Sequence, residues 1–214
     1  LYYHESADYT IFCSEIKPII HYAEISTAVN RDALNDHIIL GYALNNETIF
    51  KDIYRVPPGT SYTIKDGIII EEDRYFNIAK SSLRFNNLER ELVESVERHL
   101  ESDLPVGLML SGGVDSSLLA SIISKDLSRK HIKCYNAGSE ASKHSQDILE
   151  RTSAKLLSRR LGLKMVEVPV VNSDLMSISD YVKIVEEPIG NSGALLLGKI
   201  CAMAQETVLL TGHG

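Results

Sequence analysis

The spacing of apolar residues changes near residues 77–87 and separates two regions of the chain. In the first region, residues 61–65 (SYTIK) and 68–71 (IIIE) lie on either side of Asp66–Gly67. This dipeptide suits a two-residue type I′ turn, so the pattern predicts a β-hairpin. The first region is therefore predicted to be mixed and to contain β-structure, with a further strand over 9–13 and a short helix over 32–44 that has Asp32 near its cap.

The second region alternates between helical and strand patterns. Apolar residues recur at helical spacing between Leu88 and Leu100, behind Asn87, which is placed as an N-cap. A helix over 154–161 is predicted to end at Gly162, which suits the left-handed position after a last turn. Strands are expected over 106–110, 132–137, 164–168 and 207–211, and further helices over 118–127, 174–185 and 193–205.

This alternation predicts the fold class of the second region. Strands that alternate with helices imply right-handed crossovers, and hence an α/β fold with a parallel sheet and helices on both faces. Ligands of such sheets bind outside the carboxyl ends of the strands. Functional residues are therefore expected where these strands end.

Composition narrows the classes of protein. The chain has 214 residues, 44% of them apolar, with 22 Lys plus Arg against 29 Asp plus Glu. This composition fits one large or two small globular domains, and the net charge of −7, without a visible basic patch, argues against nucleic-acid binding. Apolar runs are far shorter than the roughly 18 residues that span a bilayer, so no membrane partner is expected.

Three widely separated cysteines, Cys13, Cys134 and Cys201, argue against a disulfide framework and favour reduced thiols and a cytoplasmic location. His131 and Cys134 have ligand-like spacing but lack a second pair, so a zinc site is not expected. The chain starts at Leu1 without a methionine and ends at an apolar strand that runs into a glycine turn. It therefore reads as an excerpt of a longer sequence.

Candidate chemistry gathers in residues 111–117 (SGGVDSS), directly after the strand over 106–110. Gly112 and Gly113 lack a Cβ, so the backbone can turn sharply and bring N–H groups against a phosphate at the positive end of the following helix. Asp115 is a hard oxygen ligand that suits Mg²⁺ held on phosphate oxygens. The alternative is a tight strand-to-helix turn with a polar cap. Neither the Gly-Lys-Ser/Thr ending of a Walker A loop nor GxGxxG is present.

The motif resembles the pyrophosphate loop of the ATP pyrophosphatases, which cleave ATP to AMP and pyrophosphate. Its neighbourhood resembles the glutamine-dependent asparagine synthetases. The first region looks like the closing part of a class II glutaminase domain, in residues 1–3 (LYY), 12–17 (FCSEIK), 48–59 (TIFKDIYRVPPG) and 74–75 (RY). The second region looks like the synthetase domain, in residues 106–117, 186–189 (EEPI) and 209–212 (LLTG).

The resemblance implies an incomplete α+β, Ntn-hydrolase-type glutaminase domain over 1–76 and a truncated synthetase domain of adenine nucleotide alpha hydrolase type over 77–214. It implies ATP and Mg²⁺ as cofactors, with Asp115 as a catalytic residue that binds Mg²⁺ through pyrophosphate. Glu150 is either an acidic landmark of the family or a first-turn helix carboxylate. The implied ATP and pyrophosphate site comprises Met109, Leu110, Ser111, Gly112, Gly113, Asp115, Ser116, Ser117, Ala137, Thr211 and Gly212.

The chain departs from the family pattern in two respects, at His213 and in having Leu1 in place of the N-terminal nucleophilic cysteine of a class II glutaminase. His213 stands where asparagine synthetases generally have an acidic residue, and it is either a general base or an ordinary turn residue. Cys13 lies inside a strand pattern and is expected to be a small buried hydrophobe, so it does not replace the nucleophilic cysteine that a class II glutaminase needs at its N-terminus.

The implied reaction is the adenylation of a carboxylate, followed by displacement of AMP by ammonia. The implied small molecules are ATP, aspartate or another carboxylate, and glutamine or ammonia as the nitrogen source. A macrolactam or β-lactam cyclase that uses the same adenylation, and a nucleotide-binding homologue without turnover, are the alternatives. The sequence leaves open whether the chain forms a homodimer.

Overall fold

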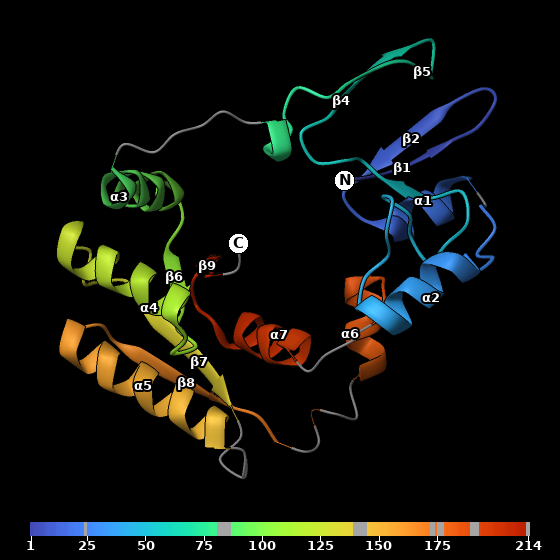
Figure 1. Cartoon of the computed structure of the whole chain (residues 1–214). Coiled ribbons are helices and arrows are strands. Elements are labelled where there is room, and N and C mark those ends of the chain that lie inside the picture. Colours follow the sequence, from blue (N-terminus) through green and yellow to red (C-terminus); the bar gives the residue numbers. More distant parts are fainter. Residues whose placement is uncertain are drawn as a thin grey trace. The chain divides into compact units, whose positions relative to one another are not determined.

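The computed structural model describes residues 1–23, 25–80, 87–138, 145–171, 174, 178–188 and 193–212 (Figure 1). The chain forms two compact units. The first unit comprises Leu1–Leu83 together with Ser179–Ser192, and the second unit comprises Arg84–Ile178 and Gly193–Gly214. The first unit is therefore built from two separate stretches of sequence.

The first unit contains a small antiparallel sheet and a hairpin. Strand β1 lies between β2 and β3 in the sheet, and β4 pairs with β5 in the hairpin. Asp66 and Gly67 have φ angles of 51° and 83°, as a type I′ turn requires, so the predicted hairpin is confirmed. The strands are β1 (Tyr2–Glu5), β2 (Thr10–Cys13), β3 (Tyr54–Arg55), β4 (Ser61–Lys65) and β5 (Ile68–Asp73).

The helices of the first unit are α1 (Ile16–Ala23), α2 (Arg31–Leu40), the 3₁₀ turn η1 (Ile78–Lys80) and α6 (Ile178–Val185). The prediction for the second of these placed Asp32 correctly near the cap, in the first turn, but extended the helix four residues too far, to Leu44. Asn30, not Asp32, caps α2, because its side-chain oxygen accepts the N–H groups of Asp32 and Ala33. The helix ends before Gly41, whose φ of 84° is left-handed.

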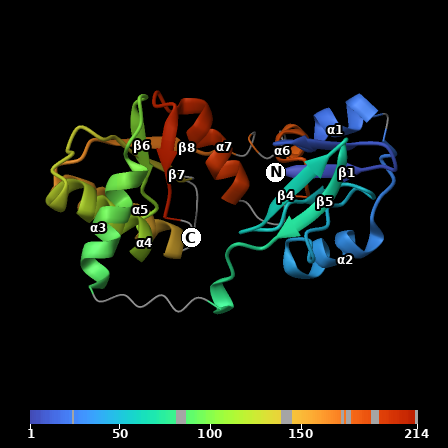
Figure 2. The same ribbon diagram turned by 90° about the horizontal axis from the view of Figure 1, so that it is seen from above.

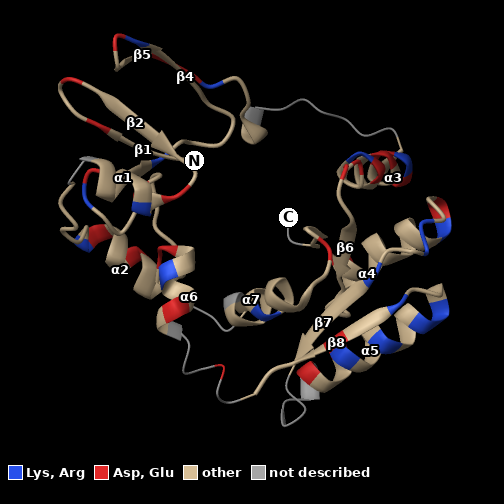
Figure 3. Ribbon diagram, turned by 180° about the vertical axis from the view of Figure 1, so that it is seen from behind, with Lys and Arg blue, Asp and Glu red and all other residues tan. Residues whose placement is uncertain are grey.

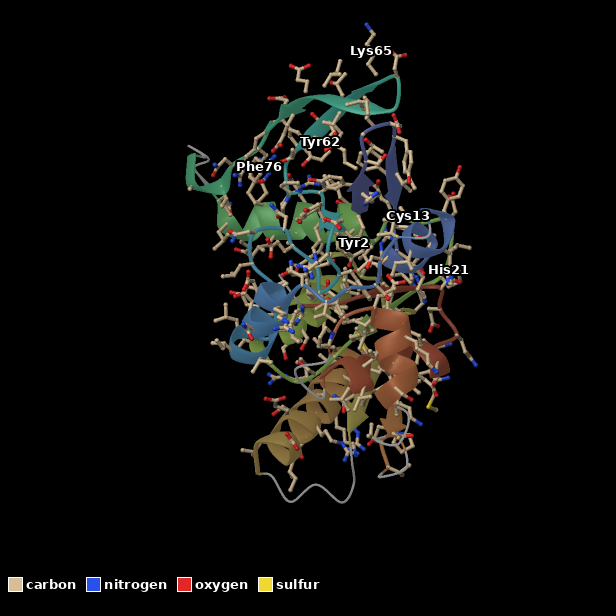
Figure 4. The ribbon with its side chains drawn as sticks, turned by 90° about the vertical axis from the view of Figure 1, so that its right-hand side faces the viewer. Tyr2, Cys13, His21, Tyr62, Lys65 and Phe76 are labelled. Carbon is tan, nitrogen blue, oxygen red and sulfur yellow. The ribbon has the colours of Figure 1, made fainter. Side chains whose placement is uncertain are left out.

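The core of the first unit forms between α1 and the sheet. Ile16, Ile19 and Ile53 are fully buried, and Cys13 packs against them. Figure 4 shows Cys13 on β2 close to α1. The thiol is half-buried in an apolar cluster, which confirms that Cys13 is a packing residue. The hairpin joins the sheet through Tyr62, whose ring lies 5.5 Å from that of Tyr3.

The second unit is an α/β layer structure around a parallel sheet with the strand order β8-β7-β6-β9. The predicted N-cap is confirmed, since the side-chain oxygen of Asn87 accepts the N–H of Arg90 at 3.1 Å, and Gly162 has the predicted left-handed φ, of 70°. Its elements are α3 (Leu88–His99), β6 (Val106–Met109), α4 (Val114–Ser121), the π-helical turn η2 (Ile122–Asp126), β7 (Cys134–Gly138), α5 (Ser145–Leu161), β8 (Met165–Pro169), α7 (Gly193–Met203) and β9 (Val208–Leu210).

Both faces of this sheet are covered. Figures 1 and 2 show α3, α4 and α5 on one face and α7 on the other. On the first face, Leu108, Ile123 and Cys134 belong to one large buried cluster. On the opposite face, Ile200 of α7 packs with Tyr135 and Val168. The predicted fold class is therefore confirmed.

Among the described residues, no helix is long and apolar enough to cross a membrane.

Candidate functional site

The candidate site lies at the topological switch point of the sheet. Strand β6 has β7 on one side and β9 on the other, so the strand order reverses direction at β6. Ligands of open α/β sheets bind at such a point, outside the carboxyl ends of the strands. Residues 111–117 follow β6 there, which places the predicted phosphate loop at the expected edge.

Gly112 holds the loop in a conformation that no other residue would fit. Its φ is 96°, and an added Cβ would lie 2.0 Å from the backbone oxygen of Glu150 in α5. Gly113 has no such restriction, because the nearest atom to its added Cβ would be the Ser111 hydroxyl at 3.4 Å. The two glycines therefore have different structural roles. Gly112 allows the loop to pack against α5, and Gly113 is the N-cap of α4.

The N-terminus of α4 is left without a side-chain cap. Its N-cap residue is Gly113, which has no side chain to accept the N–H groups of the first turn. Two hydroxyls order the loop instead. The Ser111 hydroxyl accepts the N–H of Gly113 at 3.2 Å and lies 2.9 Å from the buried Ser116 hydroxyl. An uncapped N-terminus with a glycine loop before it is suited to an anion.

The end of β9 closes this edge of the site. A Cβ on Gly212 would lie 2.8 Å from the backbone nitrogen of Ser116, so the chain after β9 contacts the first turn of α4. Only glycine permits that approach. The predicted adenine-facing residues Met109, Leu110 and Ala137 lie at the carboxyl ends of β6 and β7, at the same edge. The structure thus brings these predicted residues together, while their roles stay predictions.

Two further residues order this edge and were not singled out from the sequence. Asn136 of β7 is 5% exposed, and its Nδ2 donates to the carbonyls of Leu110, at 2.7 Å, and Ser111, at 3.4 Å. Arg151 of α5 lies against the end of β7, since a Cβ on Gly138 would meet its Cδ at 2.6 Å. An amide in an otherwise apolar strand was the available signal for Asn136. Nothing in the sequence marked Arg151.

Salt bridges connect α5 to the edge strand β8. Arg151 Nη2 lies 3.3 Å and Lys155 Nζ 2.6 Å from the carboxylate of Glu167. Hydrogen bonds from Lys155 in particular hold the pKa of Glu167 below its usual value. Figure 3 shows the Lys and Arg residues of α5 beside β8. This pairing fixes the helix whose backbone supports Gly112.

The donor set fits a magnesium ion that is shared with phosphate. Among the described residues there is no group of three or more His, Cys, Asp or Glu side chains that could hold a metal by itself. Mg²⁺ is usually held by one or two carboxylates together with substrate phosphates and water. Asp115 is exposed in the first turn of α4, next to the glycine cradle. It is therefore placed to hold Mg²⁺ only together with a bound phosphate.

Three other candidates from the sequence have separate outcomes. His213 lies outside the described residues. Glu150 lies beyond the first turn of α5, which begins at Ser145, so of its two alternatives the first-turn carboxylate was wrong and the family landmark stays a prediction. Cys134 is fully buried in the main apolar cluster, and burial raises the pKa of its thiol to about 12, so Cys134 is a core residue.

A second polar cluster lies at the opposite, amino-terminal edge of the sheet. The Tyr135 hydroxyl donates to Glu206, and Lys133 Nζ lies 2.9 Å from the same carboxylate. Burial alone would raise the pKa of Glu206, but these two donors outweigh it and lower the pKa. Lys133 and Glu206 precede β7 and β9, and Tyr135 is the second residue of β7, so the cluster lies away from the phosphate loop. It therefore stabilises the sheet and is not part of the site.

Comparison with known proteins agrees with this arrangement. Residues 87–214, more than half of the chain, match the family model for asparagine synthase, and residues 1–76 match the model for a glutamine amidotransferase domain. Both matches fall on the regions that the sequence patterns separated.

Individual relatives cover the chain to different extents. Glutamine-hydrolysing asparagine synthetase 1 of Bacillus subtilis is 27% identical over 226 residues, which cover 100% of this chain and 34% of that protein. Synthetase 3 of the same organism is 35% identical over 129 residues, which cover 56% of this chain and 21% of that protein. The amidase chry2 of Gibberella zeae is 23% identical over 196 residues, covering 81% of this chain and 29% of that protein.

The chain spans about a third of the length of the first of these relatives. The family match is nonetheless broad, because it includes the phosphate loop, all four strands of the parallel sheet and the end of β9. On this evidence the chain belongs to the asparagine synthase family.

Proposed function

We propose that this chain serves an ATP-dependent amide-forming ligase of the asparagine synthetase type. A carboxylate, in the first instance the side chain of aspartate, attacks the α-phosphate of ATP. The new C–O–P linkage gives an acyl-adenylate, and pyrophosphate leaves with the electron pair of the broken P–O bond. Ammonia, which comes from glutamine if the full N-terminal domain is present, then attacks the acyl carbon, and AMP departs. The observation that carries the proposal is the glycine loop, packed on α5, before the uncapped N-terminus of α4.

The residues of the loop act by position and charge. The N–H groups of the loop and of the first turn of α4 would bind the pyrophosphate oxygens and stabilise the charge that develops as they leave. The hydroxyls of Ser111, Ser116 and Ser117 would add donors. Asp115 would hold Mg²⁺, which supplies positive charge to the leaving pyrophosphate. Asn136 holds the start of the loop in place by donating to the carbonyls of Leu110 and Ser111.

The adenosine part would lie across the ends of neighbouring strands. Backbone groups at Met109, Leu110 and Ala137 would face adenine, and Thr211 with Gly212 would close the site from β9. The close approach of Gly212 to Ser116 supports this assignment, because it joins the end of β9 to the phosphate loop. Adenine would thus be recognised by backbone atoms, which explains why apolar residues occupy these positions.

A second candidate follows from His213, which replaces the usual acidic residue. A cyclase that forms a lactam keeps the same loop and adenylates a different carboxylate. The likeness to an enzyme named as an amidase is compatible with a relative that acts on another acyl group. The two candidates share the adenylation step and differ only in the acceptor.

Isotope exchange between pyrophosphate and ATP tests the proposal in the full-length protein. Aspartate should trigger the exchange, and Asp115→Asn should lower it by about 100-fold or more, as expected for loss of electrostatic stabilisation at the leaving group. Asp103→Asn, at another exposed carboxylate of the second unit, is the matched control and should leave the exchange unchanged. Exchange triggered by carboxylate-bearing peptides but not by aspartate would favour the cyclase. ATP binding without any AMP formation would overturn both.

A further inference from the structure

Residues 179–188 lie in an unexpected part of the molecule. The match to the asparagine synthase family runs through 87–214, yet Ser179–Ser192 pack with the first unit. The chain therefore leaves the second unit after β8, contributes α6 to the first unit, and returns at Gly193 to form α7. Contacts of Glu186 and Glu187 hold it there.

Glu186 caps a helix that lies about 170 positions away in the sequence. Its carboxylate accepts the backbone N–H of Ile16 at 2.5 Å and of Lys17 at 2.9 Å, the first two residues of α1. No acidic residue lies in the first turn of α1, and the third residue, Pro18, has no N–H. The side chain of Glu186 is only 6% exposed. A distant carboxylate thus supplies the charge that helix N-termini favour.

The backbone of Glu186 is strained, which indicates that its side chain is required. Its φ is 63°, in the left-handed region that favours glycine, and its N–H donates to the carbonyl of Val182 at 2.7 Å as α6 ends. Glycine would end α6 there without strain. A glutamate at this position therefore strains the backbone, but it supplies a carboxylate that reaches α1.

Neighbouring contacts strengthen the attachment. Glu187 forms an ion pair with Arg55, and its other oxygen lies 3.7 Å from Nε2 of the buried His37 in α2. The ammonium of Lys17 donates to the carbonyl of Lys183 at 2.9 Å and lies 3.6 Å from Glu186. Helices α1 and α2 and strand β3 thus all contact the end of α6.

We propose that Glu186, supported by Glu187, is a positioning residue that fastens the chain between β8 and α7 to the first unit and so couples glutamine use to ATP use. The inference rests on the proposed function. Helix α7 packs through Ile200 on β7 and β8, so the fastened segment leads directly into the sheet that carries the phosphate loop. Loss of the carboxylate removes its hydrogen bonds with the N–H groups of Ile16 and Lys17 and leaves residues 111–117 untouched.

Amide hydrogen exchange tests the contact without any assay of activity. In the full-length protein, Glu186→Gly removes the carboxylate and also relieves the backbone strain, so a faster exchange cannot come from a strained helix end. We expect the Ile16 and Lys17 amides to exchange at least tenfold faster, with a smaller effect for Glu186→Gln, which keeps one acceptor oxygen. Asp180→Asn, which breaks an exposed pair with Lys183 on the same helix, is the control and should change neither amide. Unchanged exchange in Glu186→Gly would overturn the proposal.

Activity then tests the coupling. In Glu186→Gly, amide formation with glutamine should fall at least tenfold, while amide formation with added ammonia stays within about threefold and AMP formed per amide is unchanged. Equal loss with both nitrogen sources would overturn the coupling and leave only a structural cap. Failure of the proposed function is distinguishable, because the unsubstituted protein would then form no amide from either source while the exchange result still stands.

Discussion

Two helix N-termini of this chain meet the same electrostatic need in opposite ways. At α1, a carboxylate of the same chain, that of Glu186, accepts hydrogen bonds from the first two backbone N–H groups of the helix. At α4, the cap is Gly113, which offers no side chain, and a glycine loop precedes it. Both helices have only eight residues, so their length does not explain the difference.

The comparison shows how one physical feature serves structure or binding. The positive end of a helix stabilises an anion wherever the anion comes from. Where the protein supplies its own carboxylate, the N–H groups are occupied and the helix is fastened. Where glycines leave them uncapped at the carboxyl edge of a parallel sheet, an external phosphate is the expected partner.

The largest expected effect comes from filling the cradle at α4. Gly112→Ala places a Cβ 2.0 Å from the Glu150 backbone oxygen at a φ of 96°. Overpacking and left-handed strain each cost roughly 1–3 kcal/mol, so the free energy of unfolding of the second unit should fall by about 3 kcal/mol or more. Urea unfolding measures this loss, and nucleotide binding should disappear with it.

Gly113→Ala is the matched control for that substitution. Its Cβ would meet nothing closer than 3.4 Å, and its φ of −72° suits any residue. We expect a change in unfolding free energy of less than about 1 kcal/mol. Equal destabilisation by the two substitutions would show that the packing of Gly112 on α5 does not define the loop.

A smaller effect is expected from making α4 resemble α1. Gly113→Asp adds a carboxylate cap where the structure has room for it. The unfolding free energy should be unchanged or rise by a few tenths of a kcal/mol, because aspartate caps a helix slightly better than glycine. ATP affinity should fall at least about tenfold, since the new charge occupies the phosphate position and repels it. Calorimetric titration with ATP measures this loss.

Gly113→Asn separates charge from shape in this experiment. Asparagine caps a helix about as well as aspartate but is neutral. It should therefore weaken ATP binding less than Gly113→Asp does. If ATP affinity stayed normal with aspartate at this position, the N-terminus of α4 would not be the phosphate site, and its contrast with α1 would lose its functional meaning.

The two N-termini also differ in how far the sequence predicts them. The loop at α4 is contiguous, and its strand, glycines and helix follow one another within residues 106–121, so local patterns place it correctly. The cap of α1 comes from Glu186, which lies far along the chain. No local sequence pattern predicts the contact between Glu186 and the start of α1. The resemblance marked Glu186 only as part of a synthetase landmark, and helix α1 itself was not predicted.

The cap of α2 and the contacts of Asn136 also depend on geometry that residue types alone do not reveal. Asp32 lies near the cap of α2, as predicted, but the cap itself is Asn30, whose extended backbone lets its side chain reach two N–H groups. No sequence pattern predicts the role of Asn136, because its partners are carbonyls of residues that follow another strand, β6. Sequence patterns thus predicted most of the elements, the fold class and the loop, while contacts between distant elements required the structure.

The smallest expected effect lies away from both helix N-termini, at the amino-terminal edge of the sheet, and it separates stability from binding. Hydrogen bonds from Tyr135 and Lys133 outweigh burial and lower the pKa of Glu206 below its usual 4.5. A carboxyl group with a lowered folded-state pKa stabilises the fold above the unfolded-state value, and this contribution is lost as the pH falls through the folded-state pKa. Glu206→Gln should therefore cost about 1 kcal/mol in urea unfolding at pH 7 and flatten the loss of stability below pH 4.5, while ATP affinity stays unchanged. A matching fall in ATP affinity would contradict the division between a stabilising edge and a binding edge.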